Sequence, residues 1–280
     1  MPSGKRSKQQ RREAAVAGRT PPPVRSKGAP RGVRQADRRV LLIAAAVVVL
    51  AGIGIGLGVA LSGGSKSSTI PKGTPTVGSL GPNALPGASQ VNKLFKGIPQ
   101  HGLTLGSPFA PAQLIEYIDL QCPICQAFET SELPTLVSRY VKPGKLKIVM
   151  KPGAIIGPDS IRGQKAAIAA SYQNRAFDFA EMLYVNQGTE NTGWLSDSMV
   201  AEAAASVPGL NVTKLFAARG SSQTTSIESS VDSKLGGAGA PYNATPTILL
   251  SHSGKTPKVV SVGLPALKTL ESQIDQAIAG

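Results

Sequence analysis

The sequence predicts a mixed α/β domain with a helical insertion, preceded by one helix that spans a membrane. Three observations carry this prediction. An apolar run at residues 40–61 contains no charge and no proline. Strand-like segments at residues 113–120 and 145–151 flank a helical segment. A helical block at about residues 158–235 is then followed by a second pair of strands and a closing helix.

The positive charge of the chain is concentrated at its N-terminus. The formal net charge is +14, and residues 1–39 contain twelve of the 30 Lys and Arg residues but only two acidic residues. These residues are poor in apolar side chains and rich in proline, glycine and charge, so we expect a disordered basic tail in the cytoplasm. No aromatic side chains are interleaved with the charges. We therefore expect contact with anionic lipid and no nucleic-acid partner.

Residues 40–61 (VLLIAAAVVVLAGIGIGLGVAL) are long enough to cross a bilayer. At about 1.5 Å per residue they extend about 33 Å, and the hydrocarbon core is about 30 Å thick. Arg38 and Arg39 precede the run directly, so the positive-inside rule places the N-terminus in the cytoplasm and the later residues outside it. A cleaved signal peptide is the alternative. Both the basic region and the apolar run are longer than such a peptide needs, which favours an uncleaved single-pass anchor in the cell membrane.

Residues 62–98 are rich in Gly, Ser, Pro and Thr and show no sustained period, which predicts a flexible linker. The short VNKLF stretch at residues 91–95 either docks onto the following domain or is its first element. The folded domain is expected at residues 99–280.

The first strand of this domain, at residues 113–120, carries apolar side chains on both faces, which is typical of a strand inside a sheet. A helix is expected from about residue 123 to residue 141, and Pro134 should bend it. The strand at residues 145–151 then completes a strand–helix–strand unit.

The C-terminal half begins with a helical block at about residues 158–235, in which Gly, Asn and Pro separate five helical segments. Residues 247–251 and 258–262 predict a hairpin, and residues 265–278 predict an amphipathic helix. Together these elements form an α/β domain with a helical insertion.

The chain contains two cysteines, Cys122 and Cys125, three positions apart at the start of the first predicted helix. Both therefore project from one face of the first turn, within reach of a disulfide. Cys122 lies at or near the N-cap, where unpaired amide groups and the helix dipole stabilise an anion, so its pKa should fall. A thiolate there is both a good nucleophile and a good leaving group, and Cys125 is the natural resolving thiol.

Three other interpretations of the pair stay open. A structural disulfide would more often join distant segments, because so small a loop constrains the unfolded chain little. A zinc site would need further ligands, and only His101 and His252 could contribute histidine nitrogens; we expect no metal. Two incidental reduced thiols are unusual outside the cytoplasm. Spacing, helix position and compartment together favour redox chemistry.

Glu116 shares a strand face with Leu114, Ile118 and Leu120, so its carboxyl group should be largely buried near the cysteine turn. Burial raises the pKa of a carboxyl group and is costly. A base at this place could take the proton from Cys125 through water. A structural ion pair is the alternative role. The neighbouring polar side chains, Asp119 and Gln121, are expected to be exposed.

The Thr245-Pro246 pair stands directly before the third predicted strand. A proline that enters a strand is usually a trans feature of a sheet edge. Here it could instead form a cis peptide beside the cysteine turn, with the backbone of Thr245 available to an extended substrate.

The motif EYIDLQCPIC at residues 116–125, with a distant Thr-Pro entering a later strand, resembles the thioredoxin superfamily. More closely it resembles the DsbA-like thiol:disulfide oxidoreductases that bacteria anchor outside the cytoplasmic membrane. The resemblance covers about residues 99–280 and includes the helical block. It implies that Cys122 is the exposed nucleophile, Cys125 its buried partner, Glu116 the buried acid and Thr245-Pro246 the cis-proline loop.

One departure from the family concerns the two residues between the cysteines, Pro123 and Ile124, which are expected to contact substrate. The best-known strong oxidants of the family have Pro-His there, and the histidine helps to stabilise the thiolate. The strength of oxidation is therefore open.

The expected function is oxidation of cysteines in reduced secreted or membrane proteins, with reoxidation by a membrane partner and no cofactor. A reductant for a dedicated client such as an apocytochrome is one alternative. A non-catalytic, membrane-tethered binding module is the other.

Overall fold

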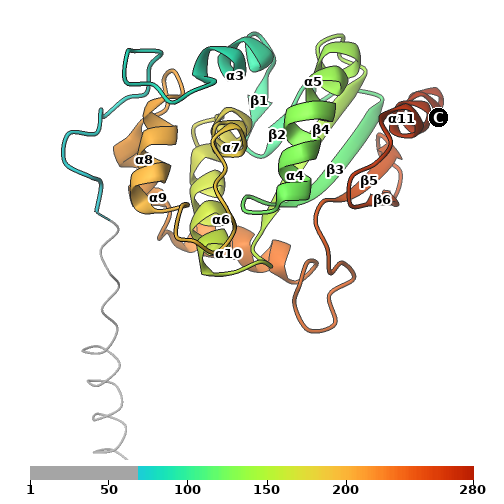
Figure 1. The fold of residues 1–280 in the computed structure, drawn as a ribbon. Coiled ribbons are helices and arrows are strands. Elements are labelled where there is room, and N and C mark those ends of the chain that lie inside the picture. The colour runs from blue at the N-terminus through green and yellow to red at the C-terminus, as the bar shows by residue number, and fades with distance from the viewer. Residues whose placement is uncertain (1–68) are drawn as a thin grey trace, which may run out of the picture. The chain divides into compact units, whose positions relative to one another are not determined.

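The computed structural model describes residues 69–280, and the predicted basic tail and membrane anchor lie outside this range. A six-stranded sheet forms the centre of the described part, with the strand order β1-β2-β4-β3-β5-β6 (Figure 1). No helix within residues 69–280 is long and apolar enough to cross a membrane.

The central strand of the sheet is β3 (Ala112–Asp119). It pairs in parallel with β4 (Leu146–Gly153) and antiparallel with β5 (Thr247–His252), so both of its edges are satisfied. β5 in turn pairs with β6 (Lys258–Val262) in the predicted hairpin. The central and largely buried position of β3 explains why its sequence is apolar on both faces.

The helix that connects β3 to β4 covers residues 123–141, as predicted, but it is not a regular α-helix. It consists of α4 (Pro123–Ala127), the π-helical segment η1 (Phe128–Glu132), α5 (Leu133–Leu136) and the π-helical segment η2 (Val137–Val141). The amide of Leu133 donates to the carbonyl oxygen of Phe128, five residues earlier. This wider turn lies directly before Pro134, which has no amide hydrogen to donate to the preceding turn.

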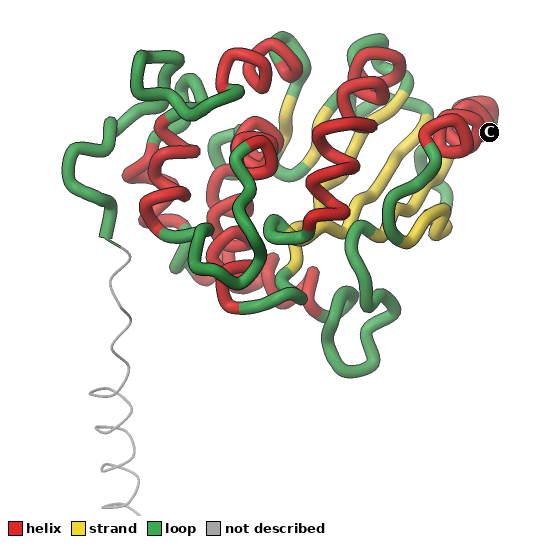
Figure 2. The backbone as a smooth tube through the Cα atoms, viewed as in Figure 1, coloured by secondary structure: helices red, strands yellow, loops and turns green. Residues whose placement is uncertain are grey.

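The helical insertion lies between β4 and β5 and contains five helices, confirming the expected block (Figure 2). They are α6 (Pro158–Ser171), α7 (Ala176–Val185), α8 (Asp197–Ala205), α9 (Val212–Ala218) and α10 (Ser222–Asp232). The closing helix is α11 (Leu267–Ala279), which buries Leu270 and Ile274.

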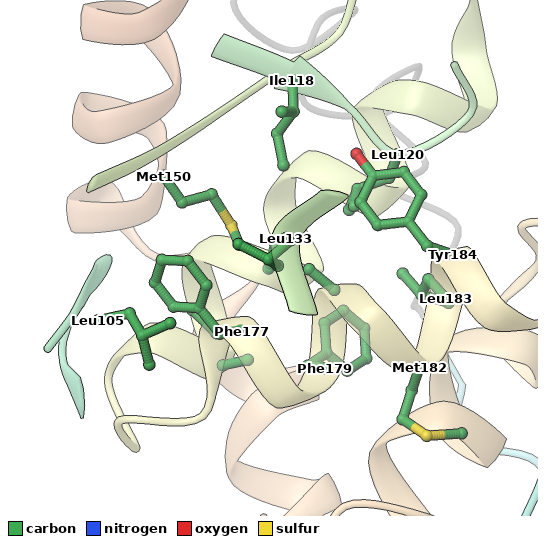
Figure 3. Packing of buried hydrophobic residues seen from close by; sticks show 14 of the residues in the cluster. Leu105, Ile118, Leu120, Leu133, Met150, Phe177, Phe179, Met182, Leu183 and Tyr184 are labelled. Atoms are coloured by element: carbon green, nitrogen blue, oxygen red, sulfur yellow. The ribbon is translucent and has the colours of Figure 1, made fainter. Parts of the chain in front are cut away.

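Helix α7 is the centre of the main hydrophobic core, because its side chains from Ala176 to Tyr184 are all buried. Phe177 and Phe179 pack among residues from the sheet and from the helix that follows β3, and Tyr184 turns its hydroxyl group toward the segment of Leu120 (Figure 3). Burying one such aromatic side chain contributes about 2–3 kcal/mol to folding. The core thus ties the insertion to the start of α4.

The predicted linker at residues 62–98 is corrected over residues 69–98, the part of it that the structure describes. Helix α3 (Ala88–Phe95), which includes the VNKLF stretch, buries Val91 and Phe95 in the main core. Before it, the amide of Gly78 donates to the carbonyl oxygen of Leu210 at 2.9 Å. Apolar contacts at helical spacing thus outweigh the local Gly and Pro content, and the domain begins well before residue 99.

Two short strands were not predicted. β1 (Gln100–His101) and β2 (Thr104–Leu105) form an antiparallel pair that extends the sheet beside β4. Strands of two residues carry no period that a sequence pattern could reveal.

Candidate functional site

The two cysteines lie on the turn that joins β3 to α4. The amide of Cys122 donates to the carbonyl oxygen of Asp119 at 2.9 Å, which closes the turn. Cys122 is the N-cap of α4, and its sulfur accepts a hydrogen bond from the amide of Cys125 at 3.4 Å. Pro123 occupies the first turn, where its missing amide hydrogen costs nothing. Both cysteines are free thiols and both are buried, Cys125 completely, as the resemblance implies. Cys122, which the resemblance implies to be exposed, has only 5% of its surface exposed.

The two thiols have opposite electrostatic environments. The pKa of Cys122 is lowered to about 6, and the side-chain hydrogen bond with Cys125 is the largest cause. Burial opposes this shift. Hydrogen bonds with Thr245 and with the amides of Cys125 and Ile124 lower the pKa further. Burial, followed by the interaction with Cys122, raises the pKa of Cys125 well above its usual value. At neutral pH the pair therefore carries one thiolate, on Cys122, and one thiol, on Cys125.

The Thr245-Pro246 peptide bond is cis and lies against the cysteine turn. The sulfur of Cys122 is 3.4 Å from the carbonyl oxygen of Thr245, although the two residues are far apart in the sequence. The carbonyl oxygen of Pro246 accepts a hydrogen bond from the amide of Gly263 at 2.8 Å. The structure thus brings together the cysteine turn, the Thr-Pro loop and the end of β6.

Apolar side chains are exposed around these three segments. Ile124, between the cysteines, is 45% exposed, and Pro123 beside it is also exposed. Val262 and Leu264, which flank Gly263, are 61% and 47% exposed. Neither Val262 nor Leu264 was predicted to belong to the site, because their link to the Thr-Pro loop depends on the hydrogen bond between Gly263 and Pro246.

Glu116 is fully buried on the core-facing side of β3, as its place in the strand predicts. Both carboxyl oxygens lack a hydrogen-bond partner in the described chain. Burial raises the pKa of Glu116 to about 8, so the carboxyl group is largely protonated at neutral pH. The alternative role, a structural ion pair, has no partner within residues 69–280.

Two further buried carboxyl groups, neither of them predicted from the sequence, accompany Glu116. Burial, and then the charges of Glu116 and Glu181, raise the pKa of Glu129 well above its usual range. Burial, and then the charge of Glu116, raises the pKa of Glu181 to about 8. Glu181 also lines a surface pocket of about 430 Å³ together with Val91 and Leu94 of α3. The three acids therefore form a buried group with one member beside solvent.

Asp119 and Gln121, which were expected to be exposed, are both completely buried. The carboxylate of Asp119 accepts hydrogen bonds from the amides of Gln121 at 2.9 Å, Ile155 at 2.9 Å and Ile156 at 3.1 Å. The segment after β4 covers the outer face of β3 at its C-terminal end. The alternation of side chains along β3 cannot reveal this covering segment. Asp119 therefore fixes the turn that holds the cysteines.

The two histidines lie apart from the cysteines. His101 is exposed in β1, and the Nδ1 atom of His252 lies 3.0 Å from the carbonyl oxygen of Ala277 in α11. Within residues 69–280 no group of three or more His, Cys, Asp or Glu side chains is arranged to hold a metal ion.

Comparison with known protein families gives one match that covers most of the domain. The family model described as Thioredoxin matches residues 100–258. The chain is also 28% identical to the probable disulfide bond formation protein D of Bacillus cereus over 99 residues, 35% of this chain and 46% of that protein. The protein of the same name from Bacillus anthracis gives the same identity and coverage. The chain thus spans less than half the length of these two relatives.

Solved structures with the same fold include two from bacteria. BdbD from Bacillus subtilis, in its oxidised form, superposes with a TM-score of 0.55 at 20% identity, covering 66% of this chain and 97% of that one. DsbA from Chlamydia trachomatis superposes with a TM-score of 0.51 at 17% identity, covering 62% and 90%. At these identities the likeness concerns the fold.

Proposed function

This chain belongs to the thioredoxin family, and we propose that it is a DsbA-like thiol:disulfide oxidoreductase that oxidises cysteines of other proteins outside the cytoplasm. The observation that carries the proposal is the asymmetry of the pair. The pKa of Cys122 is lowered to about 6, whereas burial raises that of Cys125 well above its usual value. A sulfur with a low pKa leaves readily from a disulfide, so transfer of the bond to a substrate is favoured.

In the proposed reaction, a substrate thiolate attacks the Cys122 sulfur of the oxidised pair. A mixed disulfide forms, the bond to Cys125 breaks, and the Cys125 sulfur takes up a proton. A second thiolate of the substrate then attacks the substrate sulfur of the mixed disulfide, and Cys122 leaves as a thiolate. The substrate has lost two electrons and gained a disulfide, and the Cys122–Cys125 pair has gained those electrons.

Glu116 is proposed to exchange the proton of Cys125 through water. A carboxyl group whose pKa burial raises to about 8 can both donate and accept a proton near neutral pH. Complete burial without a hydrogen-bond partner, which is costly for an acid with a purely structural role, supports this assignment.

The substrates are proposed to be reduced, extended segments of secreted or membrane proteins. Ile124 on the cysteine turn, and Val262 and Leu264 on either side of Gly263, offer exposed apolar surface, which suits a chain that has not yet buried its own apolar residues. Thr245 lies beside the Cys122 sulfur and Pro246 is bonded to Gly263, so a substrate backbone is proposed to pass along this loop.

The location and the reoxidising partner are proposed from the sequence. The uncharged run at residues 40–61 and the arginines before it favour a membrane anchor with a cytoplasmic N-terminus. A membrane protein that takes electrons from the reduced pair would then complete the cycle. Protease treatment of intact cells should digest the domain while the basic tail stays protected; digestion of the tail alone would reverse the orientation.

The activity is tested with a reduced, unfolded model substrate. Oxidised full-length protein, added in amounts stoichiometric with the substrate, should form the native disulfides of the substrate. Cys122→Ser should abolish this activity. The control is Ser253→Ala, a change at the distant turn between β5 and β6. An inert wild type that still binds unfolded protein would favour the membrane-tethered binding module, and a strongly reducing potential would favour the reductant.

A further inference from the structure

Side chains from the helical insertion hold the backbone of the redox turn. The hydroxyl group of Tyr184 donates to the carbonyl oxygen of Asp119 at 3.1 Å. The Nε2 atom of Gln187, just after α7, donates to the carbonyl oxygens of Leu120 at 3.0 Å and Cys122 at 3.4 Å. The turn is therefore fixed by groups far from it in the sequence.

The side chain of Gln121 completes this attachment from the turn itself. Its Oε1 atom accepts the amide of Asn191 at 2.8 Å, and its Nε2 atom donates to the hydroxyl group of Ser160 at 2.9 Å. The loop is packed closely here, because a Cβ atom at Gly157 would lie 2.1 Å from Oδ1 of Asn191. The loop after α7 therefore has little freedom to move away from the turn.

Gln187 binds one carbonyl group of the nucleophile Cys122 itself and one of Leu120, two residues before it. A carbonyl oxygen carries partial negative charge, so one that rotated toward the Cys122 sulfur would raise the free energy of the thiolate. An amide group has the opposite effect, and the amide of Cys125 lies 3.4 Å from that sulfur. The orientation of the turn thus sets which dipoles the thiolate meets.

We propose that Gln187 is a positioning residue for thiol–disulfide exchange, which holds the Leu120 carbonyl group toward the insertion and keeps the Cys122 sulfur over the amide of Cys125. The Cys122 carbonyl oxygen, the weaker partner of Gln187, also accepts the amide of Gln126 at 3.0 Å. The inference rests on the proposed function and makes the loop after α7 a part of the redox centre. Gln187 is half-buried, so its loss leaves no large cavity in the core. Its effect should therefore be seen on the sulfur more than on the fold.

The test compares Gln187→Leu with Gln173→Leu in the full-length chain. Gln173 is also half-buried in the insertion and makes two hydrogen bonds to the backbone of Asn211, at 3.0 and 2.9 Å, but none of these involves the turn. The readouts are the pH midpoint of the Cys122 thiolate, from its ultraviolet absorbance, and the equilibrium constant with glutathione.

Gln187→Leu should raise the thiolate midpoint by about 0.5–1 pH unit, because a neutral hydrogen bond contributes about 0.5–1.5 kcal/mol. The glutathione equilibrium should shift about 3- to 10-fold toward the oxidised protein, and Gln173→Leu should change neither readout. A Gln187→Leu midpoint equal to that of wild type, with only a loss of stability like that of Gln173→Leu, would overturn the proposal.

If Gln187→Leu does not fold, Gln187→Glu replaces it, since a carboxylate of the same length cannot donate and adds negative charge near the sulfur. The midpoint should then rise at least as far, and an unchanged midpoint overturns the proposal as before. The midpoint is read on the protein's own thiolate and needs no substrate. Failure of the Gln187 proposal is therefore distinct from failure of the proposed function, which is measured by disulfide formation in the substrate.

Discussion

Replacing Cys125 with alanine tests the origin of the low pKa of Cys122. The side-chain hydrogen bond from Cys125 is the largest influence that lowers this pKa to about 6. A hydrogen bond to a charged group contributes about 1.5–3 kcal/mol, and one pH unit corresponds to about 1.4 kcal/mol. Cys125→Ala should therefore raise the pKa of Cys122 by about 1–2 units. Cys125→Ser keeps a hydroxyl donor and should leave it near its original value.

The assay is the pH dependence of thiolate absorbance in the reduced protein, repeated as the rate of alkylation by iodoacetamide. At pH 6 the thiolate fraction should fall about 5- to 50-fold in Cys125→Ala. The midpoint is the better readout, because the intrinsic nucleophilicity of a thiolate rises with its pKa and partly offsets the loss in rate. A midpoint unchanged in the alanine variant would refute this origin and assign the effect to the backbone amides. A midpoint shifted equally in the serine variant would show that a hydrogen-bond donor at this position does not account for the low pKa.

Three further outcomes are expected. The pKa of Glu116 is raised from 4.5 to about 8, so the free energy of unfolding of the wild-type protein falls as pH rises through this window. Glu116→Gln does not titrate and should therefore gain stability relative to wild type, by up to about 5 kcal/mol between pH 4.5 and pH 8. Urea unfolding at pH 5 and pH 8 measures the difference. Tyr184→Phe removes the hydrogen bond to Asp119 and should cost about 1 kcal/mol in the same assay. Gly163→Ala should cost about 1–3 kcal/mol, because its Cβ atom would lie 3.1 Å from that of Leu120, and a wild-type melting temperature would contradict this packing.

Much of the fold could be predicted because local patterns and tertiary contacts agree in most elements. The alternation in β3 correctly placed Glu116 on the core face, and the amphipathic pattern of residues 265–278 correctly predicted α11, which buries Leu270 and Ile274. Helix α3 was predicted only in part, as a VNKLF stretch that docks onto the domain or begins it, because glycine and proline surround the stretch; Val91 and Phe95 show the spacing of a buried face. The Gly- and Pro-rich composition correctly indicates irregular backbone before this helix, but it does not predict the helix.

The candidate site could be predicted only where its members are close in the sequence. Glu129 was within reach, because it lies four residues after Cys125 and four-residue spacing puts two side chains on one helix face. Glu181 was not, since every side chain from residue 176 to residue 184 is buried and no amphipathic pattern marks one face. Gln187 depends on how the insertion docks against the turn, which no local pattern contains.

The pH linkages of the site can be separated by comparing the reduced and oxidised proteins. The buried carboxyl groups are present in both forms, so their effect on the free energy of unfolding largely cancels in the difference. The Cys122 thiolate exists only in the reduced form, and its pKa is lowered from 9.0 to about 6. Its stabilisation is fully present above the unfolded pKa and is lost as pH falls through the folded one.

The free energy of unfolding of the reduced protein should therefore rise relative to that of the oxidised protein, by about 2 kcal/mol between pH 6 and pH 8. By the thermodynamic cycle that links folding to disulfide formation, this difference in stability makes the folded protein a stronger oxidant than its unfolded chain. Denaturant unfolding of both forms at the two pH values measures it. A difference that stays constant would mean that Cys122 titrates alike in the folded and unfolded chains, and the lowered pKa could then not drive oxidation.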